Sequence, residues 1–282
     1  MSSRRTQPAS IRRPSVWASE DPVSGVSPQA MQALRVGYLL DEERWAALNG
    51  QGRNFWSAYL EEIFDRLGVT AKRIERGTLA DPKALAGYVV ICLGDLAARD
   101  LPQGALAALE RWVRVGGVLI AYNFSGADAL FGNEGAQVVP QGDDEFRISG
   151  YFQLARRRIT QGIHSRLRPR QRLIAISPLR PVRPRSSAAL ARYCSVRHGA
   201  ALNGREAGPT QQALITARRL GRGWAFYLGF DLAQTMWCLH QGRPVDRDYD
   251  GDGYLRTGDA RLIGQNEDEV AYSDELLFLL QN

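Results

Sequence analysis

The chain of 282 residues is poor in several residue types, and each shortage excludes a class of protein. Three cysteines are too few for the disulfide framework of a small secreted domain, so we expect Cys92, Cys194 and Cys238 to be free thiols. No apolar run approaches the roughly eighteen residues that a membrane-spanning helix needs. The first residues contain arginines but lack the apolar segment of a secretory signal, so a cytoplasmic location is the default expectation.

Lysine is also scarce, since only Lys72 and Lys83 occur among the 36 basic residues and the rest are arginines. The net charge of +6 is unevenly distributed. Between Phe146 and Arg222 there are 17 arginines and one acidic residue, whereas the chain from Gly223 onward has 11 acidic residues and 4 arginines. A basic surface attracts anions, so binding of nucleic acid or an acidic polysaccharide is one hypothesis. Nucleic acid is the less favoured partner, because few aromatic residues lie between these arginines.

Residues 88–126 carry the clearest structural pattern. Tyr88–Leu93 and Val118–Tyr122 are continuous apolar runs of strand length. Between them, Pro102–Val115 places apolar residues three or four positions apart, as on one face of a helix. A strand, a helix and a second strand predict a parallel pair, whose ligand crevice lies beyond the carboxyl ends of the strands. The predicted crevice residues are Gly94, Asp95, Asn123, Phe124, Ser125 and Gly126.

The remaining chain continues this alternation. Residues 1–32 are polar and contain four prolines, so we expect a disordered or extended arm followed by one domain over residues 33–282. A helix is expected from Asn54 to Leu67, after a loop that contains Trp45. Further strands are expected at Leu34–Leu40, Val69–Ile74, Glu145–Leu154, Arg172–Ile176, Ala188–Val196, Gln212–Leu220 and Trp224–Phe230. The last two flank a glycine turn and predict a hairpin, so an antiparallel extension should follow the parallel sheet.

The central motifs resemble the class I glutamine amidotransferase-like family, which has a flavodoxin-like architecture. Gly94 stands at the position of that family's oxyanion loop, and Tyr122–Gly126 corresponds to its nucleophile elbow. Phe124 occupies the position of the catalytic cysteine, and none of the three histidines has the acidic neighbour of the family's His-x-Glu pair. A phenyl ring cannot act as a nucleophile. The resemblance therefore implies an α/β, flavodoxin-like, three-layer parallel sheet with an antiparallel C-terminal extension, and no amidotransferase reaction.

The segment Gln212–Leu232 is similar to a late hairpin of amidotransferase-like domains that accompany bacterial carbohydrate-active enzymes. These include the trimerisation domain of some β-galactosidases and the ThuA-like group. The shared pattern is an apolar strand, the turn Gly221-Arg222-Gly223, and a strand that ends in Gly229-Phe230-Asp231. The resemblance implies a non-catalytic binding or assembly module in a carbohydrate context. Its partner would be a carbohydrate, another protein or a second copy of the chain.

Three carboxylates near predicted strand ends leave an enzymatic alternative open. Asp41, Asp95 and Asp231 are candidate catalytic residues for a hydrolase that acts on a glycan or an ester, because paired carboxylates perform acid–base chemistry. The competing interpretation is that these residues cap the helices that follow them. A binding module remains the favoured reading of the sequence.

The acidic segment 246–259 matches a twelve-residue calcium loop, of a kind closer to dockerins than to sensor EF-hands. Calcium prefers six to eight oxygen ligands, and glycine at the sixth position of such a loop allows its sharp turn. Gly253 occupies that position. The predicted ligands of a structural calcium ion are Asp248, Asp250, Asp252 and Asp259 through their carboxylates and Tyr254 through its carbonyl. A surface loop without an ion is the alternative.

Overall fold

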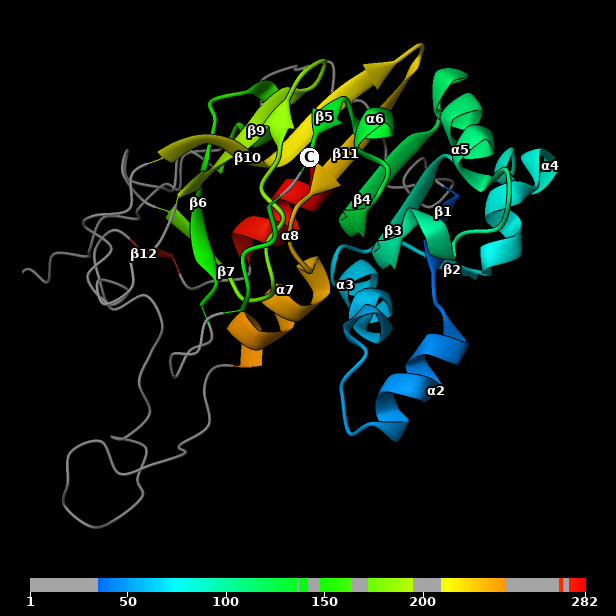
Figure 1. Ribbon diagram of the computed structural model, residues 1–282, viewed down its shortest axis with the longest axis horizontal. Helices are drawn as coiled ribbons and strands as arrows, with labels where there is room; N and C mark the ends of the chain where they lie inside the picture. The colour runs from blue at the N-terminus through cyan, green and yellow to red at the C-terminus, as the bar shows by residue number, and fades with distance from the viewer. Residues whose placement is uncertain are drawn as a thin grey trace, which may run out of the picture. The chain divides into compact units, whose positions relative to one another are not determined.

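The computed structural model describes residues 35–135, 137–141, 148–163, 172–194, 209–241, 269–270 and 274–282 (Figure 1). Its main feature is a large mixed sheet with helices on both faces. This arrangement confirms the predicted α/β class, with parallel strands in the core and antiparallel strands beside them. Among the described residues, no helix combines the length and apolar character that crossing a bilayer requires.

The parallel half of the sheet has the strand order of a flavodoxin-like fold. In sheet order its strands are β2 (Ala71–Ile74), β1 (Val36–Leu39), β3 (Val90–Ala97), β4 (Val118–Ser125) and β11 (Gly223–Leu228). All neighbouring strands in this half run parallel. Their carboxyl ends therefore lie along one edge, where ligand sites of such sheets occur.

The antiparallel half begins at the predicted hairpin. Strand β10 (Pro209–Leu220) pairs with β11 across the turn, and the sheet continues through β9 (Ala188–Cys194), β6 (Gly150–Leu154) and β7 (Arg172–Ala175). The short β12 (Glu269–Val270) adds to β7 in parallel. A separate pair joins β5 (Asn133–Glu134) to β8 (Arg183–Pro184).

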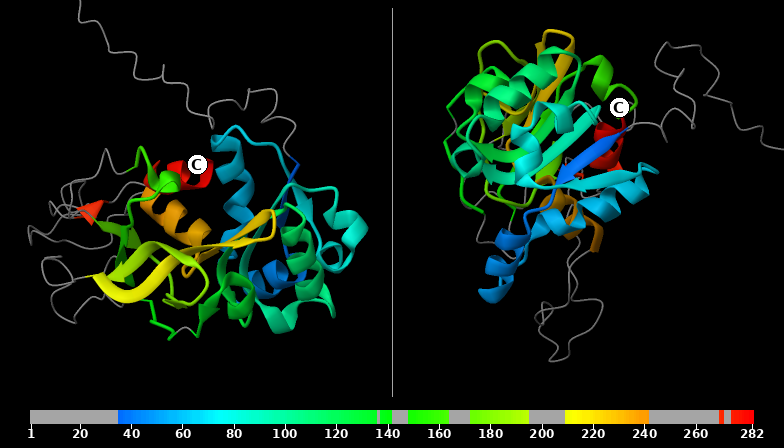
Figure 2. Two further views of the ribbon diagram at one scale, coloured as in Figure 1. Left: turned by 90° about the horizontal axis from the view of Figure 1, so that it is seen from above. Right: turned by 90° about the vertical axis from the view of Figure 1, so that its right-hand side faces the viewer.

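Helices cover the two faces of the sheet with separate apolar clusters (Figure 2). One face is covered by α3 (Leu60–Arg66), α7 (Leu232–Gln241) and α8 (Asp274–Gln281). The other is covered by α4 (Pro82–Leu85), α5 (Ala105–Arg114) and α6 (Asp128–Phe131). Short 3₁₀ helices are η1 (Trp56–Tyr59), η2 (Arg76–Ala80), η3 (Ala98–Asp100) and η4 (Arg158–Thr160). Strands β1, β3 and β4 are thus largely buried on both sides, which explains their continuous apolar runs.

The predicted loop around Trp45 was wrong, because this segment forms helix α2 (Glu42–Gly50). The helix buries none of its residues, so it carries no apolar stripe that the sequence could reveal. Its formation depends instead on its amino-terminal end. Asp41 caps the first turn through the backbone N–H of Arg44, and two acidic residues in that turn favour the helix dipole.

Candidate functional site

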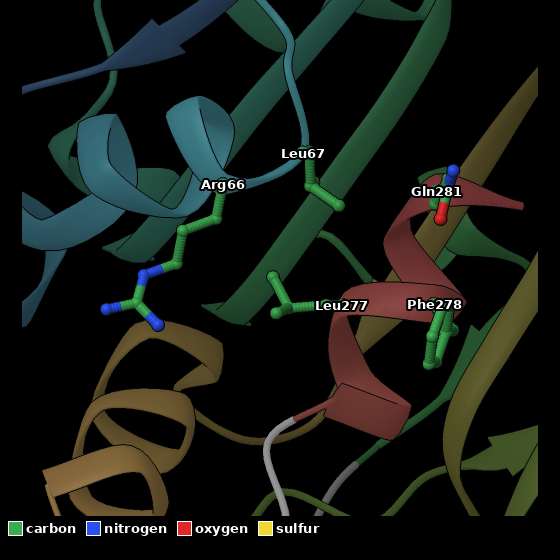
Figure 3. A pocket seen from close by; sticks show the side chains of 5 residues that line it. All are labelled: Arg66, Leu67, Leu277, Phe278 and Gln281. Carbon is green, nitrogen blue, oxygen red and sulfur yellow. The ribbon is translucent and has the colours of Figure 1, made fainter.

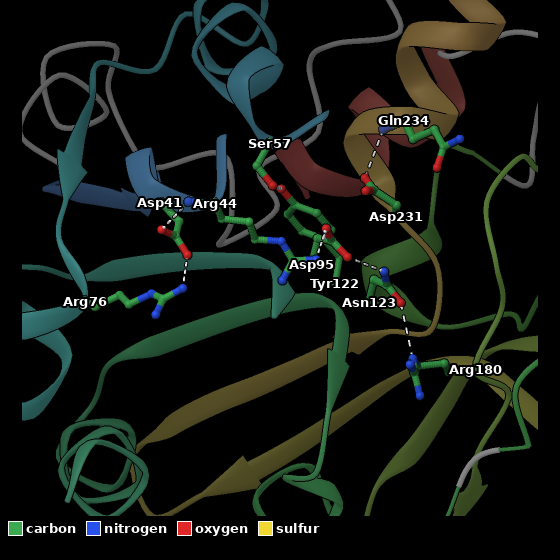
Figure 4. A network of polar contacts seen from close by, with 10 residues as sticks. All are labelled: Asp41, Arg44, Ser57, Arg76, Asp95, Tyr122, Asn123, Arg180, Asp231 and Gln234. Atoms are coloured by element: carbon green, nitrogen blue, oxygen red, sulfur yellow. Dashed lines mark hydrogen bonds and ion pairs between the residues drawn. The ribbon is translucent and has the colours of Figure 1, made fainter. Parts of the chain in front are cut away.

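A network of polar side chains lies at the carboxyl edge of the parallel strands (Figure 4). Its members come from strands β3 and β4, from the residues that follow β1 and β11, from helices α2 and α7, from η1 and η2, and from the segment between β7 and β8. The residues drawn in Figure 4 are Asp41, Arg44, Ser57, Arg76, Asp95, Tyr122, Asn123, Arg180, Asp231 and Gln234. The three carboxylates that the sequence singled out all belong to this group.

Two left-handed residues at matching positions shape the edge. Asp95 and Asn123 have φ angles of 47° and 46°, and they stand between the paired positions Gly94–Tyr122 and Leu96–Phe124. Such a conformation costs about 1 kcal/mol or more for a residue other than glycine, and Asp and Asn tolerate it best. The sequence placed the ends of both strands near here, whereas β3 and β4 continue beyond these residues to Ala97 and Ser125.

The left-handed pair also changes which face the following side chains occupy. Tyr122 lies in the apolar cluster under α3, whereas Phe124, two residues later, lies in the cluster under α5 and α6. In an uninterrupted strand these two side chains would share a face. Phe124 is 2% exposed and contacts Phe131 edge to face, with ring centres 5.9 Å apart. The prediction that Phe124 lines the crevice was therefore wrong. The residue with the strained backbone at this turn is Asn123.

Four side chains, linked one to the next by hydrogen bonds, lie across the carboxyl edge of the parallel strands. Arg44 pairs with Asp95 at 2.6 Å, Asn123 donates from Nδ2 to Asp95 Oδ1 at 2.8 Å, and Arg180 donates from Nε to Asn123 Oδ1 at 3.3 Å. Arg44 and Asp95 expose 32% and 26% of their side chains. These four side chains therefore place two guanidinium groups, one carboxylate and one amide where solvent reaches them.

Arg180 is held by its backbone, which leaves its side chain free to reach the edge. Its N–H donates to the carbonyl of Gly229 at 2.7 Å, and its carbonyl accepts from the hydroxyl of Tyr227 at 3.0 Å. A Cβ atom at position 229 would stand 2.4 Å from the Arg180 carbonyl oxygen, so this approach requires glycine. The Gly229-Phe230-Asp231 motif therefore positions two members of the network, Arg180 and Asp231.

Asp231 is a buried carboxyl in the network. Its side chain accepts the backbone N–H of Gln234 at 2.9 Å at the start of α7, and its own N–H donates to Ser177 Oγ at 2.8 Å. Burial raises the pKa of Asp231 to about 7, and the charge of Asp95 adds to this effect. Asp231 and Asp95 are thus two nearby carboxyls in very different environments.

Tyr122 and Gly94 form the floor behind the network. The Tyr122 hydroxyl donates to Ser57 Oγ at 2.9 Å, and burial, together with the charge of Asp231, raises the pKa of this phenol. A Cβ atom at position 94 would meet the Tyr122 ring at 1.7 Å. Gly94 therefore makes room for a buried ring, which is a packing role at the position where the resemblance implies an oxyanion loop.

Asp41 has partners of its own beside the network. It caps α2 through the N–H of Arg44 and forms an ion pair with Arg76 of η2. Both contacts join α2 and η2 to the end of β1. The helix-capping interpretation of Asp41 is therefore the one that its contacts support.

The last two predicted crevice residues lie beyond the network. Ser125 is the final residue of β4 and pairs with Ala97 in β3. Gly126 follows with a φ angle of 81°, and a Cβ atom there would stand 3.3 Å from that of Ala98. In the described part of the chain, the Ser125 side chain forms no hydrogen bond to the network, and Gly126 has no side chain to contribute. The structure thus brings together Asp95 and Asn123 but not Ser125 and Gly126.

The sequence reading missed the arginines that complete the network. Arg44 and Arg180 come from parts of the chain that no motif connects to the central strands. The available signal was the presence of Asp95 and Asn123 directly after apolar strand residues. Polar side chains at the ends of neighbouring parallel strands require partners, but the chain offers many arginines and the sequence does not say which ones approach.

Two of the thiols are unsuited to nucleophilic chemistry. Cys92 and Cys194 are buried, and burial raises the pKa of the Cys92 thiol to about 12 and that of Cys194 above its usual value. A reactive cysteine needs the opposite shift, because the thiolate is the nucleophile. Cys238 is partly exposed in α7, and the three cysteines are free as predicted.

Several predicted residues lie outside the part of the chain that the structure describes. These are the residues of the proposed calcium loop, 246–259. Within the described ranges, no group of three or more histidine, cysteine or acidic side chains is arranged to hold a metal ion. The calcium prediction therefore stays a prediction.

A surface pocket lies between α3 and α8 and shares no residue with the network (Figure 3). It is lined by Arg66, Leu67, Leu277, Phe278 and Gln281. Its apolar side chains belong to or pack against the cluster that covers this face of the sheet. It offers little polar chemistry beyond Arg66, whose guanidinium pairs with Glu62 at 2.6 Å.

Several arginines of the basic middle segment make contacts within the chain. Arg185 pairs with Glu134, Arg218 donates to the carbonyls of α6, and Arg222 donates to the Val115 carbonyl at 2.8 Å. These arginines hold turns and short strands against the sheet. Their contacts weaken the idea of a continuous surface for an anionic polymer.

No family model and no curated protein matches the chain. Among solved structures, a β-galactosidase from Bacillus circulans sp. alkalophilus has a TM-score of 0.50 at 12% identity, over 71% of this chain and 29% of that one. A cold-adapted β-galactosidase from Rahnella sp. R3 follows, with a TM-score of 0.49 at 16% identity, over 70% and 28% of the two chains. A protein described as ThuA-like from Bacteroides uniformis has a TM-score of 0.43 at 10% identity, over 71% and 82%.

The chain thus spans less than a third of the β-galactosidases that it resembles. At this identity, the likeness to the Bacillus enzyme concerns the fold alone. It places the chain's architecture beside one segment of a larger glycosidase.

Proposed function

We propose that this chain is a non-catalytic, amidotransferase-like module that binds saccharide at the carboxyl edge of its parallel sheet. The observation that carries the proposal is the partly exposed chain Arg44–Asp95–Asn123–Arg180. Sugar hydroxyls donate and accept hydrogen bonds at the same time, so they match adjacent carboxylate, amide and guanidinium groups. The left-handed conformations of Asp95 and Asn123 support a functional origin, because strain of this kind collects at functional sites.

The carbohydrate context comes from the fold and is an analogy. The segment of the Bacillus β-galactosidase that shares this architecture is part of an enzyme named for acting on galactosides. A fold does not fix a function, so the analogy supplies the ligand class to test and the network supplies the site.

Calorimetric titration with a panel of oligosaccharides tests the proposal. We expect at least one to bind, and we expect Asp95→Ala and Asn123→Ala to weaken that binding about tenfold or more, as the loss of one charge-assisted contact implies. Glu110→Ala is the matched control, since Glu110 pairs with Arg114 on α5 and is absent from the network. Binding that survives both network substitutions, or no binding at all, would contradict the proposal.

Hydrolysis is the second candidate function, and the unequal environments of Asp95 and Asp231 favour it. A buried carboxyl whose pKa is raised to about 7, beside a partly exposed carboxyl, is the kind of pairing that acid–base catalysis uses. Turnover of nitrophenyl glycosides or esters, lost in both Asp95→Asn and Asp231→Asn, would support a hydrolase. Turnover that these variants leave unchanged would come from another source.

The calcium loop is a separate proposal that rests on residue spacing. Asp248, Asp250, Asp252 and Asp259 with the Tyr254 carbonyl supply the oxygen ligands that calcium prefers. We expect calcium to raise the melting temperature and a chelator to lower it again, since a bound ion stabilises the state that holds it. Asp250→Ala should remove this response, whereas Asp268→Ala should retain it. An unchanged melting temperature would exclude a stabilising ion.

A further inference from the structure

The charges of the polar network indicate what kind of saccharide it would take. Arg44 and Arg180 contribute two positive charges, and Asp95 is the carboxylate between them. Asp231 is 3% exposed, so it is not one of the groups that a ligand at the edge would contact. The accessible groups Arg44, Asp95 and Arg180 together carry one excess positive charge, which a neutral sugar would leave unbalanced.

Among the described residues, Arg180 has no carboxylate partner. Arg44 forms an ion pair with Asp95 at 2.6 Å, whereas the side chain of Arg180 donates to the neutral amide of Asn123 at 3.3 Å. That contact uses Nε, so the two terminal nitrogens of the guanidinium have no hydrogen bond to another described residue. A guanidinium presents paired N–H groups that fit the two oxygens of a carboxylate.

The position of Arg180 is set before any ligand arrives. Its backbone is fixed by Gly229 and Tyr227, and its Nε is directed by Asn123 (Figure 4). A preorganised side chain loses less conformational entropy on binding, so its contact contributes more to affinity. Next to it, Asp95 and Asn123 still offer oxygen atoms to hydroxyl groups.

We propose that the ligand is an acidic saccharide, whose carboxylate pairs with Arg180 while its hydroxyls bind Asp95 and Asn123. This inference rests on the proposed saccharide-binding function and narrows it to uronate-type sugars. It also gives the unpaired guanidinium a partner of the correct charge and shape.

The test compares each acidic oligosaccharide with its own neutral form. Short oligomers of galacturonate, glucuronate and mannuronate are titrated into the protein, together with the same oligomers after reduction of their carboxyl groups to alcohols. The two forms keep the same linkage and ring stereochemistry and differ in charge. We expect one acidic form to bind about tenfold more tightly than its reduced form. Arg180→Gln should abolish that difference, so that the acidic and the reduced form bind this variant with equal affinity.

Two further variants separate the possible outcomes. Arg183→Gln removes an exposed arginine three residues away and should keep the preference for the acid. Arg180→Lys keeps the charge without the paired donors and should retain part of the preference, which also covers the case that Arg180→Gln does not fold. Equal binding of both forms, or a preference that survives in Arg180→Gln, would overturn this inference and leave saccharide binding standing. Binding of neither form across the panel would reject the proposed function itself.

Discussion

At the scale of single residues, the candidate site depends on two amino acids that adopt an unusual backbone conformation. Asp95 and Asn123 are left-handed at the same level of adjacent strands, and their side chains bond each other at 2.8 Å. The bond joins the ends of β3 and β4, so each strained residue helps to hold the other. Glycine would relax the backbone at either position but would remove half of the contact.

Gly94 should tolerate no side chain. In Gly94→Ala the new methyl group would stand 1.7 Å from the fully buried ring of Tyr122, so the ring or the strand must move. We expect a loss of about 1–3 kcal/mol of unfolding free energy, as overpacking of a core usually costs, or more. Urea denaturation measures it.

Gly50→Ala is the control for that substitution. Nothing lies within 4 Å of a Cβ atom at position 50, and the residue ends helix α2. Alanine there should be neutral or should stabilise the protein by up to about 1 kcal/mol. Equal effects of the two substitutions would contradict the packing role of Gly94.

Asp231 should make the protein less stable as the pH rises. Its pKa is raised from 3.8 to about 7 in the folded protein, so the folded state holds a proton that the unfolded state releases. The resulting stabilisation is complete below about pH 4 and is lost progressively up to about pH 7. Asp231→Asn keeps an oxygen for the Gln234 N–H and cannot ionise.

We therefore expect Asp231→Asn to unfold at a higher urea concentration than the wild type at pH 8, and at about the same concentration at pH 4. Unfolding curves at both values give the comparison. Asp128→Asn serves as a control, since that carboxylate is on α6 and belongs to the opposite side of the sheet. A stability difference between Asp231→Asn and the wild type that does not change with pH would exclude this titration.

At the scale of elements, helix α2 is held by its amino-terminal end and not by a buried face. Asp41 provides the N-cap and pairs with Arg76, Arg73 pairs with Glu42, and Arg44 pairs with Asp95. Because α2 carries Arg44 into the network, the helix and the site should form and loosen together. Binding of a ligand at Arg44 should therefore slow amide exchange in α2.

Asp41→Ala should loosen α2 more than the loss of a cap alone explains. It removes the capping bond and also removes the carboxylate that pairs with the Arg76 guanidinium. The Nε atom of Arg76 is already buried with no hydrogen-bond partner in the described part of the chain. We expect a loss of about 2–3 kcal/mol, of which the cap supplies about 1 kcal/mol. Hydrogen exchange should rise in residues 42–50.

Asp81→Ala gives the matched comparison, because Asp81 caps α4 through the Lys83 N–H at 2.8 Å and pairs with no arginine among the described residues. Its cost should be that of a cap alone, about 1 kcal/mol, with α2 exchange unchanged. Similar costs for both substitutions would mean that the Asp41–Arg76 pair contributes nothing.

The elements also show which parts of the molecule sequence patterns could predict. Buried strands and the α5 helix have continuous or periodic apolar residues, so the strands at Tyr88–Leu93 and Val118–Tyr122 and the late hairpin were confirmed. Helix α2 was missed because it buries nothing. Asp95 and Asn123 were found because polar residues at strand ends are visible in a sequence, whereas Arg180 reaches Asn123 across 57 positions through tertiary contacts alone.

At the scale of the whole molecule, β11 joins a parallel and an antiparallel half. It pairs with β4 in parallel on one side and with β10 in the hairpin on the other. The segment after it contains Gly229, against which Arg180 is fixed, and Asp231. The site is therefore assembled from both halves, and its geometry depends on how closely β11 packs against its neighbours.

Gly223, at the start of β11, allows this close packing. A Cβ atom there would lie 2.1 Å from the carbonyl oxygen of Val113 and 2.2 Å from that of Gly117, both backbone atoms that cannot rotate away. We expect Gly223→Ala to push β11 off the end of α5 and to cost about 3 kcal/mol, at the upper end of overpacking effects. Gly77→Ala is the control, because nothing lies within 4 Å of that position.

The distribution of this loss tests whether the two halves fold as one unit. If β11 couples the two halves, Gly223→Ala should lower the protection of backbone amides equally in β3 of the parallel half and in β9 of the antiparallel half, because a cooperative unit opens at one free energy. Hydrogen exchange measured by mass spectrometry gives this comparison. Affinity for any saccharide that the wild type binds should fall with it, because Arg180 and Asp95 would no longer be held at the same spacing. Protection that falls in β9 and β10 but stays at its original value in β3 would show instead that the flavodoxin-like half is stable by itself, and that the antiparallel extension delivers Arg180 to a preformed edge.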